Sequence, residues 1–253
     1  MTSDLFHGAI LKMERAQQHI KEVEAIILAY SKSKSFRLCA EEDATDGMTL
    51  LYLRVHKCLP GDDLALIIGD AIHNLWSALD HLVFAILEPQ GVDPKQIYFP
   101  VSNTLAEFNE NRRMKKIECA CPKLGDLIRE QVKPYEEGNN LLWTLNQLDI
   151  IDKHRLIIPT VVFSGLEEFS VISNDVGVYF INNGVSMEGE GCLNIARVRG
   201  KLKITNKGRP IVDVRFGKDT PCEGKSVAAE LKEIAKKVSE TIDLFSAYAQ
   251  NSE

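Results

Sequence analysis

The sequence predicts an α+β fold, with long helices forming a bundle-like lobe and short strands forming an antiparallel β-meander. Three observations support this class. Long stretches in the first two thirds and at the end of the chain carry apolar residues at helical spacing. Brief runs of β-forming residues gather between residues 160 and 216. The helical and strand-like segments are grouped along the chain, whereas a doubly wound parallel sheet would alternate them.

The composition is that of an ordinary folded protein. Of 253 residues, 45% are hydrophobic and 26% are charged, which is too apolar for a disordered chain. The net charge of -6 argues against a general nucleic-acid binder, because non-specific affinity for nucleic acid comes mainly from cations. The longest apolar stretch, residues 64–87, contains Asp, Asn and His side chains that would be costly in a bilayer, so we expect no membrane-spanning helix.

The start of the chain and its cysteines indicate a cytoplasmic protein. The first residues lack the basic and apolar segments of a secretory signal, and the six cysteines lack the spacing of a disulfide scaffold. Cys119 and Cys121 form a close pair, but no second pair or His-x-x-His motif completes a zinc site. The sequence contains neither the G-x-G-x-x-G motif of dinucleotide-binding folds nor the G-x-x-x-x-G-K-[ST] motif of P-loop proteins. We therefore expect neither a metal nor an organic cofactor.

The first part of the chain is predicted to be helical around one early hairpin. The most apolar helix starts between Pro60 and Asp63, where an aspartate can cap free N–H groups, and it ends at Pro89. Two segments rich in β-forming residues, with turn residues between them, indicate the hairpin. In chain order we expect helix 5–33, strands 36–40 and 49–55, helix 62–88, an extended piece at 97–101, and helices 104–116, 123–132 and 139–157.

The second part is predicted to be a β-meander closed by an amphipathic helix at about 224–249. Turn signals at 182–184 and 206–208 separate the short β-forming runs. The expected division is a mainly helical lobe at 1–159, which includes the hairpin, and a β-meander with its closing helix at 160–253. One continuous domain is the alternative.

One face of the helix at 62–88 is polar over roughly three turns. At 100° per residue the polar side chains fall within an arc of roughly 120°. They are Asp70, His73, Asn74, Ser77, Asp80 and His81. These short groups suit hydrogen-bond networks, proton transfer or metal ligation, whereas an ordinary solvated face carries Lys, Glu and Arg. This polar stripe therefore either lines a functional cleft or forms a buried network that fixes helix packing.

Charged residues at the end of helix 139–157 are the expected partners of the polar stripe. If the two helices pack, they gather a base, an orienting carboxylate and cations able to bind a phosphate. The residues that would meet are His73, His81, Asp80, Asp149, Lys153, His154 and Arg155. The alternative is that Asp149 and Lys153 form an ordinary i, i+4 pair and that basic residues complement the helix macrodipole.

The segments from Asp70 to His81 and from Leu148 to Arg155 resemble the paired GDxxHNLxSALDH and LDxxDKHR signatures of a bacterial family without an assigned function. This resemblance covers about residues 60–160 and implies kinship of fold. The first segment is also similar to the R-x-x-x-x-H motif of the HEPN superfamily, in which a helix-borne Arg and His cleave RNA without a metal. His81 matches that His, Asn74 matches the polar residue before the Arg, and Trp76 stands at the Arg position.

The HEPN resemblance implies RNA as a partner and a homodimer. Combined with the expected packing of helices 62–88 and 139–157, it gives a candidate catalytic set of His81, His73, Asp80 and Arg155, with Asn74, Lys153 and His154 as candidate substrate contacts. Indole has neither the permanent charge nor the forked donors of arginine. The resemblance therefore implies either a non-catalytic member or a site in which Arg155 replaces the missing cation.

A run of alternating basic residues follows in the β-rich part. Arg197, Arg199, Lys201 and Lys203 would point to one side of an extended strand. Such a cationic face can contact a phosphate backbone, and we expect the first three to bind RNA. The alternative is a solvated hairpin face, or an edge strand that its charges protect against further pairing.

Three functional hypotheses follow from these features. The first is an RNA-associated, HEPN-like protein that cleaves RNA or is a non-catalytic relative. The second is a non-enzymatic binding protein in which the polar stripe is a structural network and the β-rich part provides the contact surface. The third is a metal-dependent hydrolase using His73, His81 and either Asp70 or Asp149, whose spacing fits one helix face but no known ligand signature.

Overall fold

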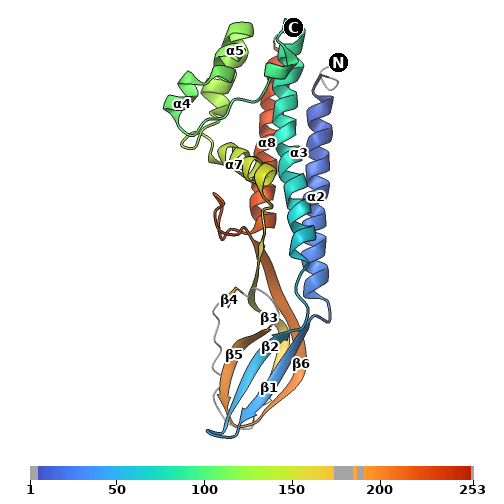
Figure 1. Cartoon of the computed structure of the whole chain (residues 1–253). Coiled ribbons are helices and arrows are strands. Elements are labelled where there is room, and N and C mark those ends of the chain that lie inside the picture. Colours follow the sequence, from blue (N-terminus) through green and yellow to red (C-terminus); the bar gives the residue numbers. More distant parts are fainter. Residues whose placement is uncertain (1–4, 174–184, 187–190, 252–253) are drawn as a thin grey trace.

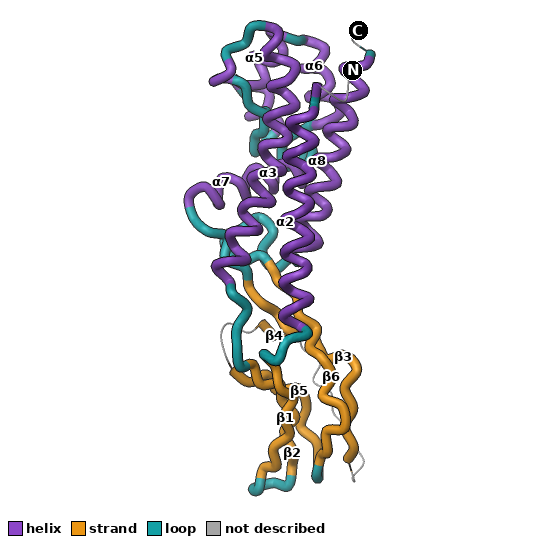
Figure 2. The backbone as a smooth tube through the Cα atoms, turned by 90° about the vertical axis from the view of Figure 1, so that its right-hand side faces the viewer, coloured by secondary structure: helices purple, strands orange, loops and turns teal. Residues whose placement is uncertain are grey.

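Long helices run side by side at one end of the molecule, and twisted strands fill the other end (Figure 1). The computed structural model describes residues 5–173, 185–186 and 191–251. The start of α2 and the end of α8 lie at the tip of the helical lobe, away from the strands (Figure 1 and Figure 2). The separate helical and antiparallel strand regions confirm the predicted α+β class.

Three long helices form the centre of the helical lobe. They are α2 (His7–Ser31), α3 (Gly61–Leu87) and α8 (Val227–Gln250), which pack against one another, and α7 (Asn140–His154) packs against α3 and α8. The spacing of apolar residues predicts all four, because each buries one stripe or more of its surface. Within the described part of the chain, none of the helices combines the length and the apolar character needed to cross a membrane.

α3 begins without the predicted aspartate cap. Its first residue follows Pro60, whose backbone is extended, and no side chain at that position accepts a hydrogen bond from the first turn. Asp62 and Asp63 lie within the first turn, where their charge complements the positive end of the macrodipole. At the other end, Pro89 lies in a 3-10 turn, Glu88–Gln90, which ends the helix as predicted.

The segment between α3 and α7 forms short helices. Asn111 divides the predicted helix 104–116, because its backbone is extended and its side-chain oxygen accepts hydrogen bonds from the N–H groups of Arg113 and Met114. Local capping therefore ends one helix and starts the next. The elements are a 3-10 turn (Pro94–Gln96), α4 (Leu105–Glu110), α5 (Arg112–Ala120), α6 (Pro122–Leu127) and a π-helical turn (Ile128–Val132).

The described strands of the β lobe form two three-stranded antiparallel sheets. The first has the order β1 (Phe36–Asp43), β2 (Met48–Val55), β5 (Gly191–Arg199), and the second has the order β4 (Val185–Ser186), β3 (Thr160–Ser173), β6 (Leu202–Arg215). The hairpin of β1 and β2 is where the sequence predicts it. The later strands are antiparallel as predicted but do not all pair in chain order, because β5 joins β2 and β3 pairs with β6.

One of the two predicted turn signals lies inside a strand. Gly208 has a φ of 62°, Glu168 has a φ of 55°, and neither residue has a partner in the register of β3 and β6. A Cβ at Gly208 would lie 2.5 Å from the carbonyl oxygen of Glu167, so glycine here permits a close approach of two strands. The other signal, at 182–184, lies outside the described residues.

Each lobe contains segments from both halves of the chain. β2 pairs with β5, and α8 packs against α2 and α3. The expected boundary between residues 159 and 160 therefore does not separate the two lobes. One hydrophobic cluster runs from the helices into the base of the β lobe, at Val55, Phe163 and Val214. A second, smaller cluster in the β lobe consists of Leu38, Leu51, Ala196 and Val198. Long-range pairing of this kind cannot be read from local periodicity.

Candidate functional site

The polar stripe of α3 faces two different neighbours. On one side, Asn74 accepts a hydrogen bond of 3.4 Å from Lys12 of α2. His81 lies over Gly8 of α2, where an added Cβ would be 2.7 Å from Nδ1 of His81. Burial and the Lys12 ammonium lower the pKa of His81. The other side of the stripe faces α7, so the stripe does not line a single cleft.

Asp149 of α7 is the centre of the polar contacts on that second side. Its side chain is buried, with 3% exposed, and its two oxygens have different partners. Oδ1 lies 3.2 Å from Nδ1 of His73 on α3, and Oδ2 accepts a hydrogen bond of 2.5 Å from Nζ of Lys153. A buried carboxylate is costly unless it is paired. The His73 contact therefore joins α7 to α3, and Lys153 pairs with Asp149 within α7; both partners keep about half of their side-chain surface exposed.

Asp80 anchors the chain that follows α3. Its Oδ1 accepts a hydrogen bond of 2.8 Å from the backbone N–H of Phe99. Burial raises the pKa of Asp80 to about 6, although the Phe99 N–H, Arg113 and Lys153 all favour the charged form. Desolvation therefore affects the pKa of Asp80 more than the nearby donor and cations do. Through its hydrogen bond to Phe99, the carboxyl group holds the segment after α3 in place.

The raised pKa of Asp80 predicts a specific dependence of stability on pH. The folded state binds this proton more tightly than the unfolded state, whose aspartate pKa is about 3.9. The stability that the folded protein gains from the proton on Asp80 is therefore complete below about pH 4, and it is lost as the pH rises through about 6. Asp80→Asn keeps an oxygen acceptor for Phe99 but does not titrate. Between pH 4 and 8 we expect wild type to lose on the order of 3 kcal/mol relative to this variant in denaturant unfolding, and parallel curves would contradict the assignment.

Asp152 contacts α3 at a position that sequence reasoning did not single out. A Cβ added at Gly69 would lie 2.4 to 2.7 Å from three atoms of the Asp152 carboxyl group. Burial and the neighbouring carboxylates of Asp149 and Asp70 raise the pKa of Asp152. The available signal was Gly69 itself, because a glycine inside a helix is unfavourable unless another group approaches closely.

Arg155 lies away from these contacts, at the junction of the two lobes. It follows the last residue of α7, and its guanidinium donates a hydrogen bond of 3.2 Å to the carbonyl oxygen of Asp219. His154 is exposed, and its side chain forms no hydrogen bond or ion pair within the described ranges. The basic residues at the end of α7 therefore do not converge on one point.

The expected catalytic set is consequently divided among three places. His81 lies against α2, His73 and Asp80 lie on the other side of the stripe, and Arg155 lies at the lobe junction. The expected meeting of His73, Asp149 and Lys153 is what the structure shows. The set is divided because α2 packs against one side of the polar stripe of α3 and α7 packs against the other side.

Trp76 belongs to the hydrophobic core. It is 6% exposed, and its ring meets the ring of Phe99 edge to face, with centroids 6.3 Å apart and an angle of 86° between planes. The position at which HEPN motifs carry a catalytic arginine is thus filled by a packed aromatic group.

The expected run of basic residues is broken by a turn. β5 ends at Arg199, and Gly200 has a φ of 80°, so Lys203 lies on β6 in the other sheet. The four side chains therefore do not form one strand face. Arg197 forms ion pairs with Asp43 and Asp46 of the β1–β2 hairpin. The ammonium group of Lys201 lies 3.5 Å from the carboxylate of Glu42 in the same hairpin.

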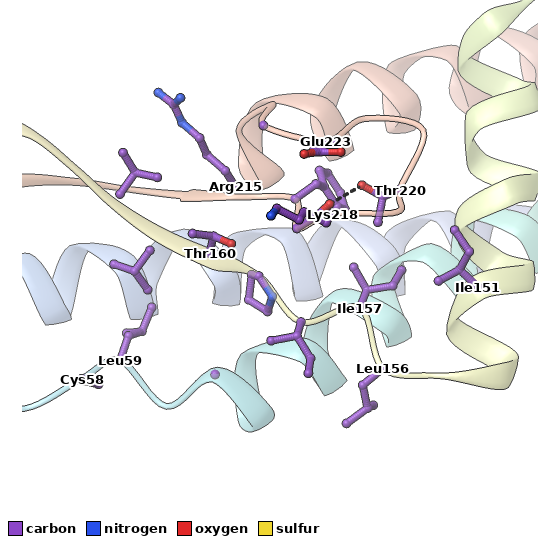
Figure 3. A pocket seen from close by; sticks show the side chains of 18 of the residues that line it. Cys58, Leu59, Ile151, Leu156, Ile157, Thr160, Arg215, Lys218, Thr220 and Glu223 are labelled. Atoms are coloured by element: carbon purple, nitrogen blue, oxygen red, sulfur yellow. Dashed lines mark hydrogen bonds between the residues drawn. The ribbon is translucent and has the colours of Figure 1, made fainter. Parts of the chain in front are cut away.

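A cavity of about 1010 Å³ lies at the junction of the lobes (Figure 3). Its walls come from the end of α2, the start of α3, the end of α7, and the ends of β3 and β6 where they enter the helical lobe. Arg155 lines this cavity. The cavity was not predicted, because its walls come from segments that are distant in the sequence.

In the described parts of the chain, no group of three or more His, Cys, Asp or Glu side chains is arranged to hold a metal ion. Comparisons of the chain with models of protein families, with curated proteins and with solved structures give no match.

Proposed function

We propose that this chain is a non-enzymatic binding protein in which the polar groups between α3 and α7 form a structural network. The observation that carries the proposal is the environment of Asp149. The residue is 2% exposed, and both carboxylate oxygens contact donors, one on each helix. A catalytic carboxylate must reach its substrate, whereas this one is covered and satisfied. Its role is to join α7 to α3.

The position of cations supports the same conclusion. Metal-independent RNA cleavage needs a positive charge beside the catalytic histidine to stabilise the developing phosphate charge. His81 lies beside Gly8 at the start of α2, and this end of α2 is at the tip of the helical lobe (Figure 1). Arg155 instead lines the cavity at the lobe junction. Trp76 occupies the core. Neither position expected to supply the cation faces His81, and the ammonium group that does lie near His81, that of Lys12, donates a hydrogen bond to Asn74. RNA binding and a homodimer, which the HEPN resemblance implies, stay predictions.

The proposal is tested by incubating the purified protein with a mixed RNA pool, with and without a chelator. We expect no cleavage in either condition, because the expected base, acid and cation, His81, Asp80 and Arg155, lie at different places in the fold. The variants His81→Ala and His56→Ala are tested beside wild type, since His56 is an exposed histidine outside the stripe. Chelator-resistant cleavage that His81→Ala abolishes and His56→Ala retains would overturn the proposal in favour of an RNA-cleaving enzyme.

A further inference from the structure

The cavity at the lobe junction has a largely apolar wall. Its inner surface includes Tyr30 of α2, Val55 of β2 and Phe163 of β3, all of them buried. Leu156 and Ile158, which also line it, keep 44% and 62% of their surface exposed. Large aliphatic side chains that are exposed beside a cavity provide apolar surface for a ligand to cover.

The loop that joins β6 to α8 forms another wall, and it is held in a fixed position. The N–H of Gly224 donates to the carbonyl oxygen of Phe216 (3.0 Å), and the N–H of Phe216 donates to that of Lys225 (3.0 Å). Gly217 lies directly against Ile158, because an added Cβ would be 2.6 Å from the Ile158 carbonyl oxygen. These contacts fix this wall of the cavity, which reduces the entropy lost when a ligand binds against it.

The charged residues that line this cavity are mostly basic, and the flanking carboxylates of Asp219 and Asp213 pair with Arg155 and Arg215. Arg155, Arg215 and Lys218 line it, and Glu223 is the one acidic residue among its described lining residues. Lys218 is exposed and forms no ion pair or hydrogen bond with the part of the chain that the structure describes. Figure 3 shows Lys218 among the other labelled lining residues, whereas the Arg215 side chain extends away from them. An anion in the cavity would therefore meet the ammonium group of Lys218.

Arg155 is the second cation available to such an anion. Its ion pair with Asp219 is long, at 3.7 Å, and the two side chains are 55% and 76% exposed. An exposed pair of this kind contributes little to stability. The guanidinium has five N–H donors, so it can bind a ligand while it still contacts the loop.

We propose that this cavity binds a small amphipathic anion, with an apolar body against Leu156 and Ile158 and a carboxylate or phosphate head group at Lys218 and Arg155. The inference rests on the proposed function, because it names the ligand class of a binding protein. The volume of about 1010 Å³ is at the upper end of small-molecule sites, which span about 300–1,000 Å³. Because the cavity walls come from both lobes, the ligand also stabilises their arrangement.

The test is calorimetric titration of the full chain with decanoate, decyl phosphate and 1-decanol. The three probes share an apolar chain, and the third lacks a charge. We expect one site for the anions and at least tenfold weaker binding of 1-decanol. Lys218→Glu should weaken anion binding about tenfold or more, because it reverses the charge beside the head group. Lys207→Glu is the matched control, since Lys207 is an exposed lysine of β6 outside the cavity.

A second variant tests the apolar part of the site. Ile158→Ser should weaken all three probes, because it removes exposed apolar surface from the cavity wall. Circular dichroism checks that each variant is folded. Tighter binding of decyl phosphate assigns a phosphate head group, and tighter binding of decanoate assigns a carboxylate.

Three results would overturn the inference: no binding of either anion, equal binding of decanoate and 1-decanol, or unchanged affinity in Lys218→Glu. A failure of the proposed anion binding and a failure of the proposed function can be told apart. RNA cleavage is tested at His81, beside α2, and anion binding is tested at Lys218, in the loop after β6. Either experiment can fail while the other succeeds.

Discussion

Replacing Trp76 by alanine is expected to lower the free energy of unfolding by about 4 kcal/mol. The indole is 6% exposed and meets the fully buried ring of Phe99 edge to face, so the truncation leaves a large cavity between α3 and the chain that follows it. Chemical denaturation monitored by far-UV circular dichroism measures the change. This signal reports the helices directly and does not depend on the tryptophan that is removed.

The matched control is Trp76→Phe, which keeps an aromatic ring against Phe99. We expect this variant to lose about 1 to 2 kcal/mol, because a smaller ring leaves a smaller cavity. A loss below about 1 kcal/mol in Trp76→Ala would show that the position is not part of the packed core. It would also reopen the hypothesis that the matching HEPN position faces a functional cleft.

Replacing His73 and Lys153 together by alanine is expected to cost about 3 kcal/mol at pH 8. The reason is the burial of Asp149, whose side chain is 3% exposed and whose carboxylate oxygens contact these two side chains. Without them a buried carboxylate is left unpaired, and such a group is strongly unfavourable. Denaturant unfolding of wild type and the double variant gives the difference.

The control is the same pair of changes in an Asp149→Asn background. Asparagine carries no charge, so we expect the two alanine changes to cost less than about 1 kcal/mol there. An equal cost in both backgrounds would contradict the network, because the two donors would then contribute by packing alone.

The parts of the fold that could be predicted from the sequence are those with local causes. The apolar spacing of α3 and the turn residues between β1 and β2 each lie within a single short segment. Asn111 shows the limit of this approach, because a single capping side chain divides a predicted helix into α4 and α5. Gly208 shows another limit, since the same residue type that permits a turn permits a close approach of two strands.

The candidate site was predictable only in part. Asp149 and Lys153 are four residues apart on one helix, so their pairing follows from helix geometry. The cavity was not predictable, because Arg155 and Lys218 reach it from different segments and are brought together by packing of the lobes. Gly69 carried a signal in the sequence, but the group that approaches it, Asp152, could not be identified without the structure.

The sequence by itself determined the long helices, the early hairpin and the polar character of one face of α3, because periodicity and turn chemistry act over a few residues. Only the tertiary structure decided which polar groups meet. Asn74 contacts Lys12, which is 62 residues away in the chain, and His73 contacts Asp149, which is 76 residues away. Such pairs depend on how helices pack against each other, and the period of one helix does not contain that information.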